Sequence, residues 1–269
     1  MSTKQPIAAL VLAGAPNRGP LASVSDSPYE ALIEIEGRPM IAYVLDALRQ
    51  APSIGPIGIV GPVEELAAAL DVKDEQLISP VGSLLDNLEH GARALLGEGS
   101  AGRERLLVIT SDIPLVTTEA IEDFVERCRR RDKEAGGPGS LDAFYPMVSR
   151  ESSEARFPSG RRTYVSLREG VYTGGNCVLL SPEVLLKQRP LFEQAVALRK
   201  DPVGMARLLG LGFIIKFLMR RLSAADIERV VRQKLGINGA IIPVPYAEIG
   251  FDVDKPKDLE LARRALAGR

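Results

Sequence analysis

Residues 7–19 read I-A-A-L-V-L-A-G-A-P-N-R-G, an apolar run that leads into a turn rich in glycine. The run from Ile7 to Leu12 is apolar throughout, which is typical of a parallel strand buried on both faces. Such a turn leaves backbone N–H groups free, and Arg18 beside them suits phosphate oxygens. The same residue types also form ordinary surface turns, so this stretch alone leaves a phosphate-binding loop and a simple turn both open.

Beyond this turn, strand-like runs alternate with amphipathic helical stripes. The expected strands are 32–35, 57–60, 76–79 and 105–110, and the expected helices are 40–48, 64–70, 84–96 and 118–128. This alternation is typical of an α/β fold with a doubly wound, mainly parallel central sheet of the Rossmann-like type. After a Gly-rich connection at 134–140, the pattern changes to strands at 142–148, 174–180 and 241–244, with a polar loop over 151–162. We therefore predict a single domain, 1–269, with a smaller mixed C-terminal portion.

An unusual apolar stretch spans residues 202–222 and reads P-V-G-M-A-R-L-L-G-L-G-F-I-I-K-F-L-M-R-R-L. Its longest uninterrupted apolar run, 208–215, is too short to span a bilayer. We interpret the stretch as a buried helix pair packed on the domain. The alternatives are an apolar wall for a substrate, a partner subunit in a homodimer, or a membrane surface.

The composition narrows the classes of function. The formal net charge of −1 is unlike that of a bulk nucleic-acid binder, so no nucleic-acid partner is expected. Two cysteines and one histidine offer neither zinc-ligand spacing nor a Ser-His-Asp arrangement. The cysteines also suggest a reducing compartment, and no stretch suits a transmembrane segment or a cleaved leader. We expect a cytoplasmic protein.

Acidic side chains stand at two places that could carry chemistry. Asp112 follows the strongest strand pattern, residues 105–110, and ligands of open α/β sheets bind at that carboxyl edge. Asp252 and Asp254 form a D-x-D just before a helix expected at 257–267. Carboxylate oxygens and substrate phosphates are the ligands that Mg²⁺ takes. Asp112 also suits a plain strand end and Asp254 a helix N-cap, but their joint occurrence with the first turn favours a metal–phosphate site.

Five segments occur in a fixed order along the chain. They are L-A-G-A-P-N-R-G (12–19), E-A-L-I-E-I-E-G-R-P-M-I-A-Y-V-L-D-A-L (30–48), I-T-S-D-I-P-L-V-T (109–117), Y-T-G-G-N (172–176) and F-D-V-D-K-P-K-D-L (251–259). Together they resemble the sugar-nucleotide-transferase-like NTP transferases. These are relatives of the molybdenum-cofactor guanylyltransferases and of cytidylyl- and guanylyltransferases that act on small phosphorylated alcohols.

The resemblance implies a nucleotide-diphospho-sugar transferase type of fold, with a nucleotide-binding half at 1–135 and an acceptor-side half at 141–269. The apolar region 202–235 then stands out as a helical insertion. The implied reaction is nucleotidyl transfer: a phosphate oxygen of a small phosphorylated acceptor attacks the α-phosphorus of an NTP, and pyrophosphate leaves. Such a step depends mostly on positioning and on charge neutralisation, for which Mg²⁺ is the implied cofactor.

On the nucleotide side, the resemblance implies that Arg18 is a catalytic residue in contact with the phosphates. Ser83 and Asn87, at the start of a helix, match a segment that contacts the base or the ribose. Contacts from the first turn to the nucleotide are implied at Leu12, Ala13, Gly14 and Ala15.

On the metal and acceptor sides, Asp112 matches the catalytic, metal-binding aspartate of the family. Asp252 or Asp254 would provide the second carboxylate for the metal. The segment that matches the acceptor side consists of Gly174, Gly175 and Asn176.

Two departures from the family pattern bear on activity. Ala15 stands where the family's loop has a second glycine, so the backbone approaches a phosphate less closely. Glu30 occupies the position of a lysine that neutralises phosphate charge in the transition state. Two alternatives therefore stay open: a glycosyltransferase that uses a nucleotide-sugar, and a nucleotide-binding regulatory protein with impaired catalysis. Arg161 and Arg162 form a further candidate phosphate clamp, with a solvated loop pair as the alternative.

Overall fold

The computed structural model describes residues 5–97, 105–158, 160, 162–187, 189, 193 and 210–267. The strands of its main sheet are β1 (Ile7–Leu12), β4 (Ile54–Val60), β5 (Gln76–Ile78), β6 (Leu106–Thr110), β7 (Ala143–Ser149), β8 (Val165–Leu167), β9 (Gly170–Gly174), β10 (Cys177–Leu180) and β11 (Gly239–Val244). Its helices are α1 (Met40–Arg49), α2 (Val63–Ala69), α3 (Leu84–Leu96), α4 (Thr118–Glu134), α5 (Arg150–Arg156), α6 (Pro182–Lys187), α9 (Leu211–Leu218), α10 (Ala224–Leu235) and α11 (Pro256–Leu266).

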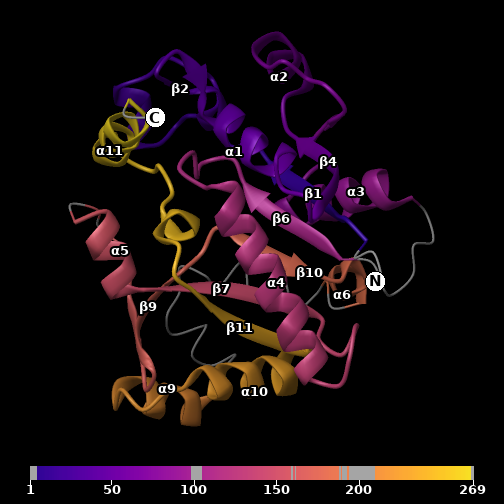
Figure 1. Ribbon diagram of the computed structural model, residues 1–269, viewed down its shortest axis with the longest axis vertical. Helices are drawn as coiled ribbons and strands as arrows, with labels where there is room; N and C mark the ends of the chain where they lie inside the picture. The colour runs from indigo at the N-terminus through magenta and orange to yellow at the C-terminus, as the bar shows by residue number, and fades with distance from the viewer. Residues whose placement is uncertain are drawn as a thin grey trace.

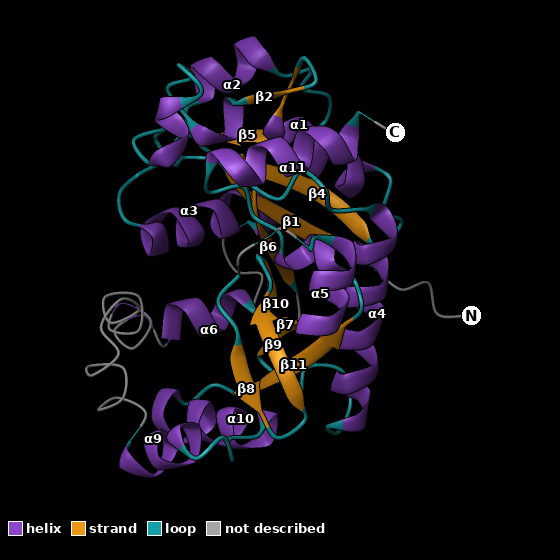
Figure 2. Ribbon diagram, turned by 90° about the vertical axis from the view of Figure 1, so that its left-hand side faces the viewer, coloured by secondary structure: helices purple, strands orange, loops and turns teal. Residues whose placement is uncertain are grey.

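The first four strands of the main sheet are parallel and stand in the order β5-β4-β1-β6. Helix α3 lies on one side of the sheet and α4 on the other, as Figure 1 and Figure 2 show. Successive side chains of a strand point to opposite faces, so β1 contributes to two cores. Ala9 and Val11 join the core that contains α1 and α4, whereas Ala8 and Leu10 join the core beneath α3. The predicted doubly wound α/β fold is confirmed.

The same sheet continues into the second half of the chain through two antiparallel pairings. Strand β10 pairs with β6 on one side and with β7 on the other. Strand β11 runs parallel to β7 along the opposite edge of β7, and β9 pairs with the end of β7. Two reversals of direction restore the original one, so β7 and β11 run parallel to β6. The carboxyl end of β11 therefore lies at the same edge of the sheet as the carboxyl ends of β1 and β6.

Two local predictions are corrected by the structure. The expected strand at 32–35 is reduced to Glu34–Ile35 (β2), which pairs with Arg38–Pro39 (β3), and Glu30–Leu32 forms a 3₁₀ turn. This turn buries Ala31 and Ile33 in the core, where a longer strand has no neighbour to pair with.

The expected polar loop at 151–162 is also partly wrong, because it begins with helix α5. Ser149 caps that helix by accepting a hydrogen bond from the backbone N–H of Ser152 at 3.0 Å. The sequence did not predict this helix, because only a small part of its surface is buried and it therefore lacks an apolar stripe.

The region 202–235 is described only in part, since residues 202–209 lie outside the described ranges. Helices α9 and α10 lie at one end of the long axis of the molecule (Figure 1). Phe213 and Leu222 pack against Met147 and Leu167 of the sheet, but the end of α9 is exposed. The prediction that this stretch is buried is therefore wrong for residues 215–221. None of the helices in the described ranges combines the length and apolar content that crossing a bilayer requires.

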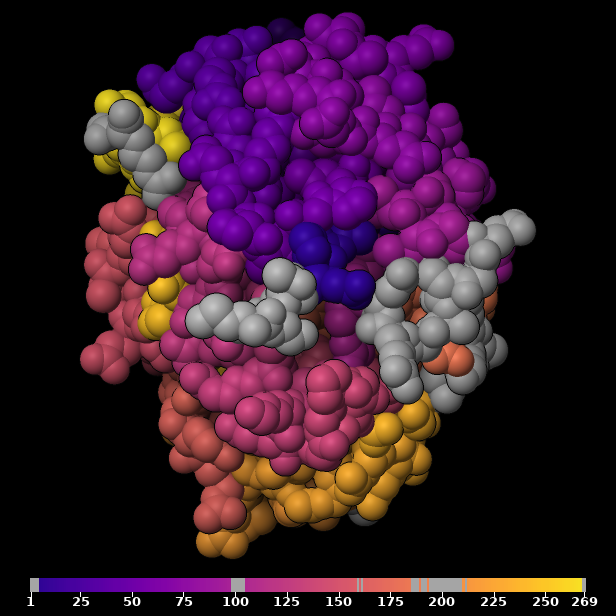
Figure 3. Space-filling model, turned by 45° about the vertical axis from the view of Figure 1, so that its right-hand side comes forward, coloured from indigo at the N-terminus to yellow at the C-terminus, as the bar shows by residue number. Residues whose placement is uncertain are grey.

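A cavity of about 1090 Å³ opens at the amino edge of the parallel strands, beside the start of β1 and the end of α4. Figure 3 views this face, with the indigo start of β1 above the pink segment that follows α4. Both arginines that line it are bound by other groups: Arg105 pairs with Asp132 at 3.0 Å, and Arg129 donates to the backbone oxygen of Gln5 at 3.1 Å. This cavity lies at the edge opposite to Asp112.

Helix α3 approaches the sheet closely at Gly91, which gives a test of the packing. A Cβ atom at Gly91 would lie 2.7 Å from methyl carbons of Leu10 and 2.9 Å from Val60. We expect Gly91→Ala to lower the free energy of unfolding by about 1–3 kcal/mol in urea denaturation. Gly212→Ala in α9 is the matched control, because its new Cβ meets no atom within 4 Å among the described residues, apart from its chain neighbours and its own helix backbone. The control should leave stability unchanged or raise it by up to about 1 kcal/mol. Equal stability of the Gly91→Ala protein and wild type would contradict the packing of α3.

Candidate functional site

Three carboxylates from distant parts of the chain meet at the carboxyl edge of the sheet. Asp112 follows β6, and Asp252 and Asp254 follow a 3₁₀ turn at Ala247–Gly250. One oxygen from each of the three side chains lies within 4.8 Å of the others. The backbone N–H of Val253 donates to the backbone oxygen of Asp112 at 2.8 Å, which joins the two segments directly. In Figure 1 the yellow segment that leads from β11 to α11 passes beside the end of β6.

Arg162 holds the Asp252 segment in place. Its guanidinium donates to the backbone oxygen of Asp252 at 2.8 Å and forms an ion pair with the carboxylate of the same residue at 2.9 Å. The group also stacks over the ring of Phe251, with 4.4 Å to the ring centre, and its side chain is only 8% exposed. Arg162 is therefore engaged with Asp252 and is not part of a solvated loop pair, which was the alternative to a phosphate clamp. Arg161, the other member of that predicted clamp, lies outside the described residues.

Asp254 does not cap the following helix, which was the alternative to a metal-binding role. The N-cap residue of α11 is Lys255, and no side chain caps that end of the helix. The Asp254 side chain is exposed, whereas those of Asp112 and Asp252 are half-buried. Asp254 is thus available to a ligand from solvent.

The pKa values of the cluster are raised by burial and by the approach of the carboxylates. Burial raises the pKa of Asp112, and the carboxylate of Asp252 adds to that shift; a hydrogen bond from the Thr110 hydroxyl and the charge of Arg162 oppose it. Desolvation and the neighbouring carboxyl of Asp252 raise the pKa of Asp254 to about 7. The charges of Asp112 and Glu30 contribute further to the raised pKa of Asp254. Like charges held close together are expected to protonate in this way.

Glu30 lies within electrostatic range of the same cluster, which the sequence alone could not establish. Burial and the charge of Asp112 raise the pKa of the Glu30 carboxyl. Its backbone N–H donates to the carbonyl oxygen of Ala15 at 3.0 Å, so the 3₁₀ turn that carries Glu30 is attached to the first loop. A fourth acidic group therefore lies within electrostatic range of the three aspartates.

The loop that follows β1 lies at the same edge. The backbone N–H of Ala13 donates to the oxygen of Val60 at 2.8 Å, which extends the parallel pairing of β1 with β4. Gly14, Ala15 and Arg18 are exposed. In the described part of the chain the Arg18 side chain has no hydrogen bond or ion pair, and a Cβ at Gly14 would meet nothing closer than the Cα of Gly61 at 3.9 Å.

Asn17 gives this loop its shape, a role that sequence reasoning missed. Its side-chain amide donates to the backbone oxygens of Ser25 and Ser27, both at 3.0 Å. Its backbone N–H donates to the oxygen of Pro28 at 2.9 Å. One asparagine thus closes the polar segment 18–29 into a compact loop; its position between proline and arginine was the only signal.

The side chains of Ser83 and Asn87 form hydrogen bonds within the connection between β5 and α3. The Ser83 hydroxyl accepts from the backbone N–H of Asp86 at 3.3 Å in a capping box. The amide oxygen of Asn87 accepts from the backbone N–H of Val81 at 2.7 Å. These bonds shape the turn at the carboxyl end of β5, which is at the same edge as Asp112, and nucleotide contacts from Ser83 and Asn87 stay a prediction.

Gly174, Gly175 and Asn176 connect β9 to β10. A Cβ at Gly174 would collide with the hydroxyl of Tyr145, and one at Gly175 would lie 2.7 Å from Ile249. The Asn176 backbone donates to the oxygen of Ile249 at 2.9 Å and accepts from the N–H of Thr110 at 3.1 Å. Packing thus accounts for the two glycines, and acceptor binding by this segment stays a prediction.

Comparison with known proteins identifies the family to which the chain belongs. Residues 9–210 match the family described as the MobA-like NTP transferase domain. The chain belongs to this family. A probable molybdenum cofactor guanylyltransferase from Thermococcus kodakarensis is 30% identical over 140 residues, which cover 48% of this chain and 63% of that protein. The matched part is therefore less than two thirds of that relative's length.

Solved structures share the MobA-like fold over nearly the whole chain. A hypothetical transferase from Thermus thermophilus has a TM-score of 0.76 and 35% identity, covering 95% of this chain and 100% of that one. A CMP:2-keto-3-deoxy-manno-octonic acid synthetase in complex with CTP has a TM-score of 0.59 and 16% identity, covering 98% and 99%. The 4-diphosphocytidyl-2C-methyl-D-erythritol synthase of Anaerococcus prevotii has a TM-score of 0.55 and 12% identity, covering 98% and 97%. The latter two likenesses concern the fold alone.

The raised pKa of Asp254 predicts a stability that depends on pH. The folded state binds more protons than the unfolded state between the usual aspartate pKa of about 4 and the folded value of about 7. Folding stability without divalent cations should therefore fall as pH rises through this window. We expect Asp254→Asn to be more stable than wild type by about 1 kcal/mol at pH 8, after allowance for solvent screening, and equal to it at pH 4.

Thermal unfolding in the presence of a chelator measures this difference. Glu260→Gln removes an exposed carboxylate of α11 outside the cluster and should show no such pH-dependent gain. Adding Mg²⁺ at pH 8 should raise the Tm of wild type more than that of Asp254→Asn. A wild-type Tm that stays level from pH 4 to pH 8, with no gain in the Asp254→Asn protein, would contradict repulsion in the cluster.

Proposed function

We propose that this protein transfers a nucleoside monophosphate from an NTP to a small phosphorylated acceptor and releases pyrophosphate, with Mg²⁺ as the cofactor. The observation that carries the proposal is the convergence of Asp112, Asp252 and Asp254 within 4.8 Å beside the loop that follows β1. Membership of the MobA-like NTP transferase family supports an NTP as the nucleotide. The cytoplasm, where NTPs are abundant, is the expected compartment.

The donor set fits Mg²⁺. Hard divalent cations take carboxylate oxygens as ligands. Asp112, Asp252 and Asp254 would hold the ion, because one oxygen from each lies within 4.8 Å of the others. Bound there, Mg²⁺ would neutralise charge on the triphosphate and polarise the α-phosphoryl group.

The chain's own residues would supply the remaining positioning. The exposed backbone of Gly14 and Ala15 can approach a phosphate, since no side chain of the described structure covers Gly14. Arg18 offers a guanidinium whose donors match phosphate oxygens in pairs. The backbone around Ser83, at the carboxyl end of β5, stands at the right edge to contact the base or ribose. Holding the reacting groups in this way is the main source of rate in phosphoryl transfer.

Glu30 supports a second candidate, a nucleotide-binding regulatory protein with impaired catalysis. Its carboxylate contributes to the raised pKa of Asp254, so it adds negative charge where a triphosphate would lie. A nucleotide-sugar-dependent glycosyltransferase is a third candidate, because a diphosphate could use the same carboxylates through a metal. These candidates differ in the ligand that binds and in whether pyrophosphate is released.

Calorimetry separates the candidates. Each of the four NTPs and a panel of nucleotide-sugars is titrated into the protein with and without Mg²⁺, and pyrophosphate release is then followed with phosphorylated alcohols as acceptors. We expect metal-dependent NTP binding and acceptor-dependent pyrophosphate release. Asp112→Asn should lower the rate of release at least about 100-fold, while Glu260→Gln should leave it unchanged. A preference for nucleotide-sugars would overturn the proposal, and NTP binding without release would favour the regulatory protein.

Replacement of Glu30 tests whether this position faces phosphate. Glu30→Lys exchanges a repulsive charge for an attractive one, so we expect NTP binding to tighten at least about fivefold, most of all at low Mg²⁺. Glu34→Lys makes the same change of charge at an exposed residue of β2 and should have a much smaller effect. Unchanged affinity in Glu30→Lys would show that Glu30 points away from the bound nucleotide. Release of pyrophosphate by Glu30→Lys alone would identify the wild-type chain as catalytically impaired.

A further inference from the structure

The end of α9 exposes a concentrated group of apolar side chains. Among the described residues, large hydrophobic side chains are exposed at Val24, Val81, Leu84, Tyr145, Ile215, Phe217, Leu218 and Met219. The last four fall within five consecutive residues, whereas the first four are scattered. Leu218 is 73% exposed and Met219 is 55% exposed. We name residues 215–221 the α9 tip. Clustering of this kind marks an interaction surface, whereas single exposed hydrophobic residues are ordinary.

The α9 tip is held in a defined conformation. Phe213 before it and Leu222 after it pack against the sheet. The helix ends in a tight turn, in which the backbone N–H of Arg221 donates to the oxygen of Lys216 at 2.7 Å. Arg220 has φ +54°, a left-handed conformation that glycine adopts more easily. The helix end therefore carries an arginine at a position where glycine would fit with less strain.

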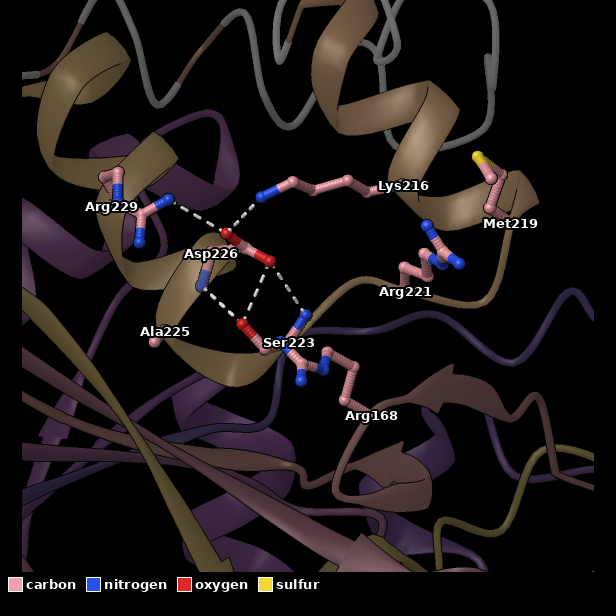
Figure 4. Close-up of a pocket in the computed structure, with 8 residues that line it drawn as sticks. All are labelled: Arg168, Lys216, Met219, Arg221, Ser223, Ala225, Asp226 and Arg229. Atoms are coloured by element: carbon pink, nitrogen blue, oxygen red, sulfur yellow. Dashed lines mark hydrogen bonds and ion pairs between the residues drawn. The ribbon is translucent and has the colours of Figure 1, made fainter.

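Basic side chains surround the same exposed apolar residues. A cavity of about 840 Å³ beside the α9 tip is lined by Arg168, Lys216, Met219, Arg221, Ser223, Ala225, Asp226 and Arg229. The carboxylate of Asp226 forms ion pairs with Lys216, at 2.7 Å from its Nζ, and with the guanidinium of Arg229, at 2.9 Å (Figure 4). Within the described ranges, the guanidinium groups of Arg168 and Arg221 have no acidic partner. This cavity thus keeps a surplus of positive charge.

The stretch of sequence around the α9 tip also has an excess of basic over acidic residues. Residues 202–222 contain four basic residues and no acidic one. A surface with cations beside clustered apolar side chains matches the interface of an anionic membrane, where a plane of phosphates covers an apolar layer. The location agrees with such a role, because α9 lies at the end of the long axis opposite to α1 and α2 (Figure 1). Docking through this end would leave the carboxylate cluster, just before α11, open to solvent.

We propose that the α9 tip binds the surface of membranes that contain anionic phospholipids. Phe217, Leu218 and Met219 enter the region of the upper acyl chains, while Arg168, Arg220 and Arg221 bind headgroup phosphates. The association is peripheral, because α9 spans only Leu211–Leu218. The proposal does not depend on the reaction performed at the carboxylate cluster.

Flotation with lipid vesicles tests the proposal. The whole protein is mixed with vesicles of phosphatidylcholine alone, or with vesicles that also contain about a third phosphatidylglycerol, at low and high salt. We expect flotation with the anionic vesicles only, and loss of that binding at high salt, since surface charges are screened. Each arginine near the surface contributes about fivefold to the partition constant, so Arg220→Gln combined with Arg221→Gln should weaken binding roughly 25-fold.

Two further variants separate the apolar and basic contributions. Leu218→Ser combined with Met219→Ser should weaken binding to anionic vesicles without changing the Tm by more than a few degrees, because both side chains are exposed. Arg93→Gln combined with Arg264→Gln removes two exposed arginines elsewhere, which are 58% and 72% exposed, and should float like wild type.

Three outcomes would overturn the proposal. The first is absence of flotation with anionic vesicles at low salt. The second is equal loss of binding in the Arg93 and Arg264 control, which would indicate non-specific charge attraction. The third is a dimer in sedimentation that Leu218→Ser and Met219→Ser convert to a monomer, which would identify a second copy of this chain as the occupant.

Discussion

The mutual repulsion of Asp112, Asp252 and Asp254 is the constraint on which the site depends. Three carboxylates with oxygens within 4.8 Å would separate unless the backbone held them together. Arg162 offsets part of this charge from the buried side, and the hydrogen bond between Val253 and Asp112 fixes the spacing of the two segments. Desolvation and, after it, the repulsion that remains raise the pKa of Asp254 to about 7. Strain of this kind persists only where the surrounding structure over-determines it.

The topology of the sheet explains how residues about 140 positions apart reach one edge. Parallel strands β1, β4, β5 and β6 place their carboxyl ends together. The two antiparallel steps through β10 return β7 and β11 to the same direction. The segment that follows β11 therefore emerges beside Asp112, and the ion pair with Arg162 has only to fix a loop that the sheet has already brought near.

The sequence predicted the features that depend on strong periodic patterns. The apolar runs at 7–12 and 105–110 identified two central parallel strands, and Asp112 was located from the end of the second. Features set by tertiary contacts could not be read in this way. The segment at 151–162 is polar, but α5 forms there because Ser149 caps it. Ile215, Phe217, Leu218 and Met219 are apolar, yet their side chains face solvent, since hydrophobicity does not specify which partner covers a surface.

Asp254 and Glu30 are two further residues whose roles depend on tertiary contacts and could not be predicted from the sequence. Asp254 before a proline has the pattern of a helix cap, and only the three-dimensional position of Lys255 shows that the cap lies one residue later. Glu30 was recognised as a departure from a family pattern, but its effect depends on where the carboxylate points. Its contribution to the raised pKa of Asp254 places it within range of the cluster.

This placement changes how charge is balanced at the site. A lysine at position 30 would bring a fixed positive charge to the phosphates, whereas Glu30 brings a fourth negative one. Arg162 is already engaged with Asp252, and Arg18 is exposed on the loop that follows β1. Under the proposed function, the neutralisation of a bound triphosphate would be left to Arg18 and to cations drawn from solution. An affinity that depends steeply on divalent cations follows from this arrangement, because the protein itself supplies less of the positive charge than a site with a fixed lysine would.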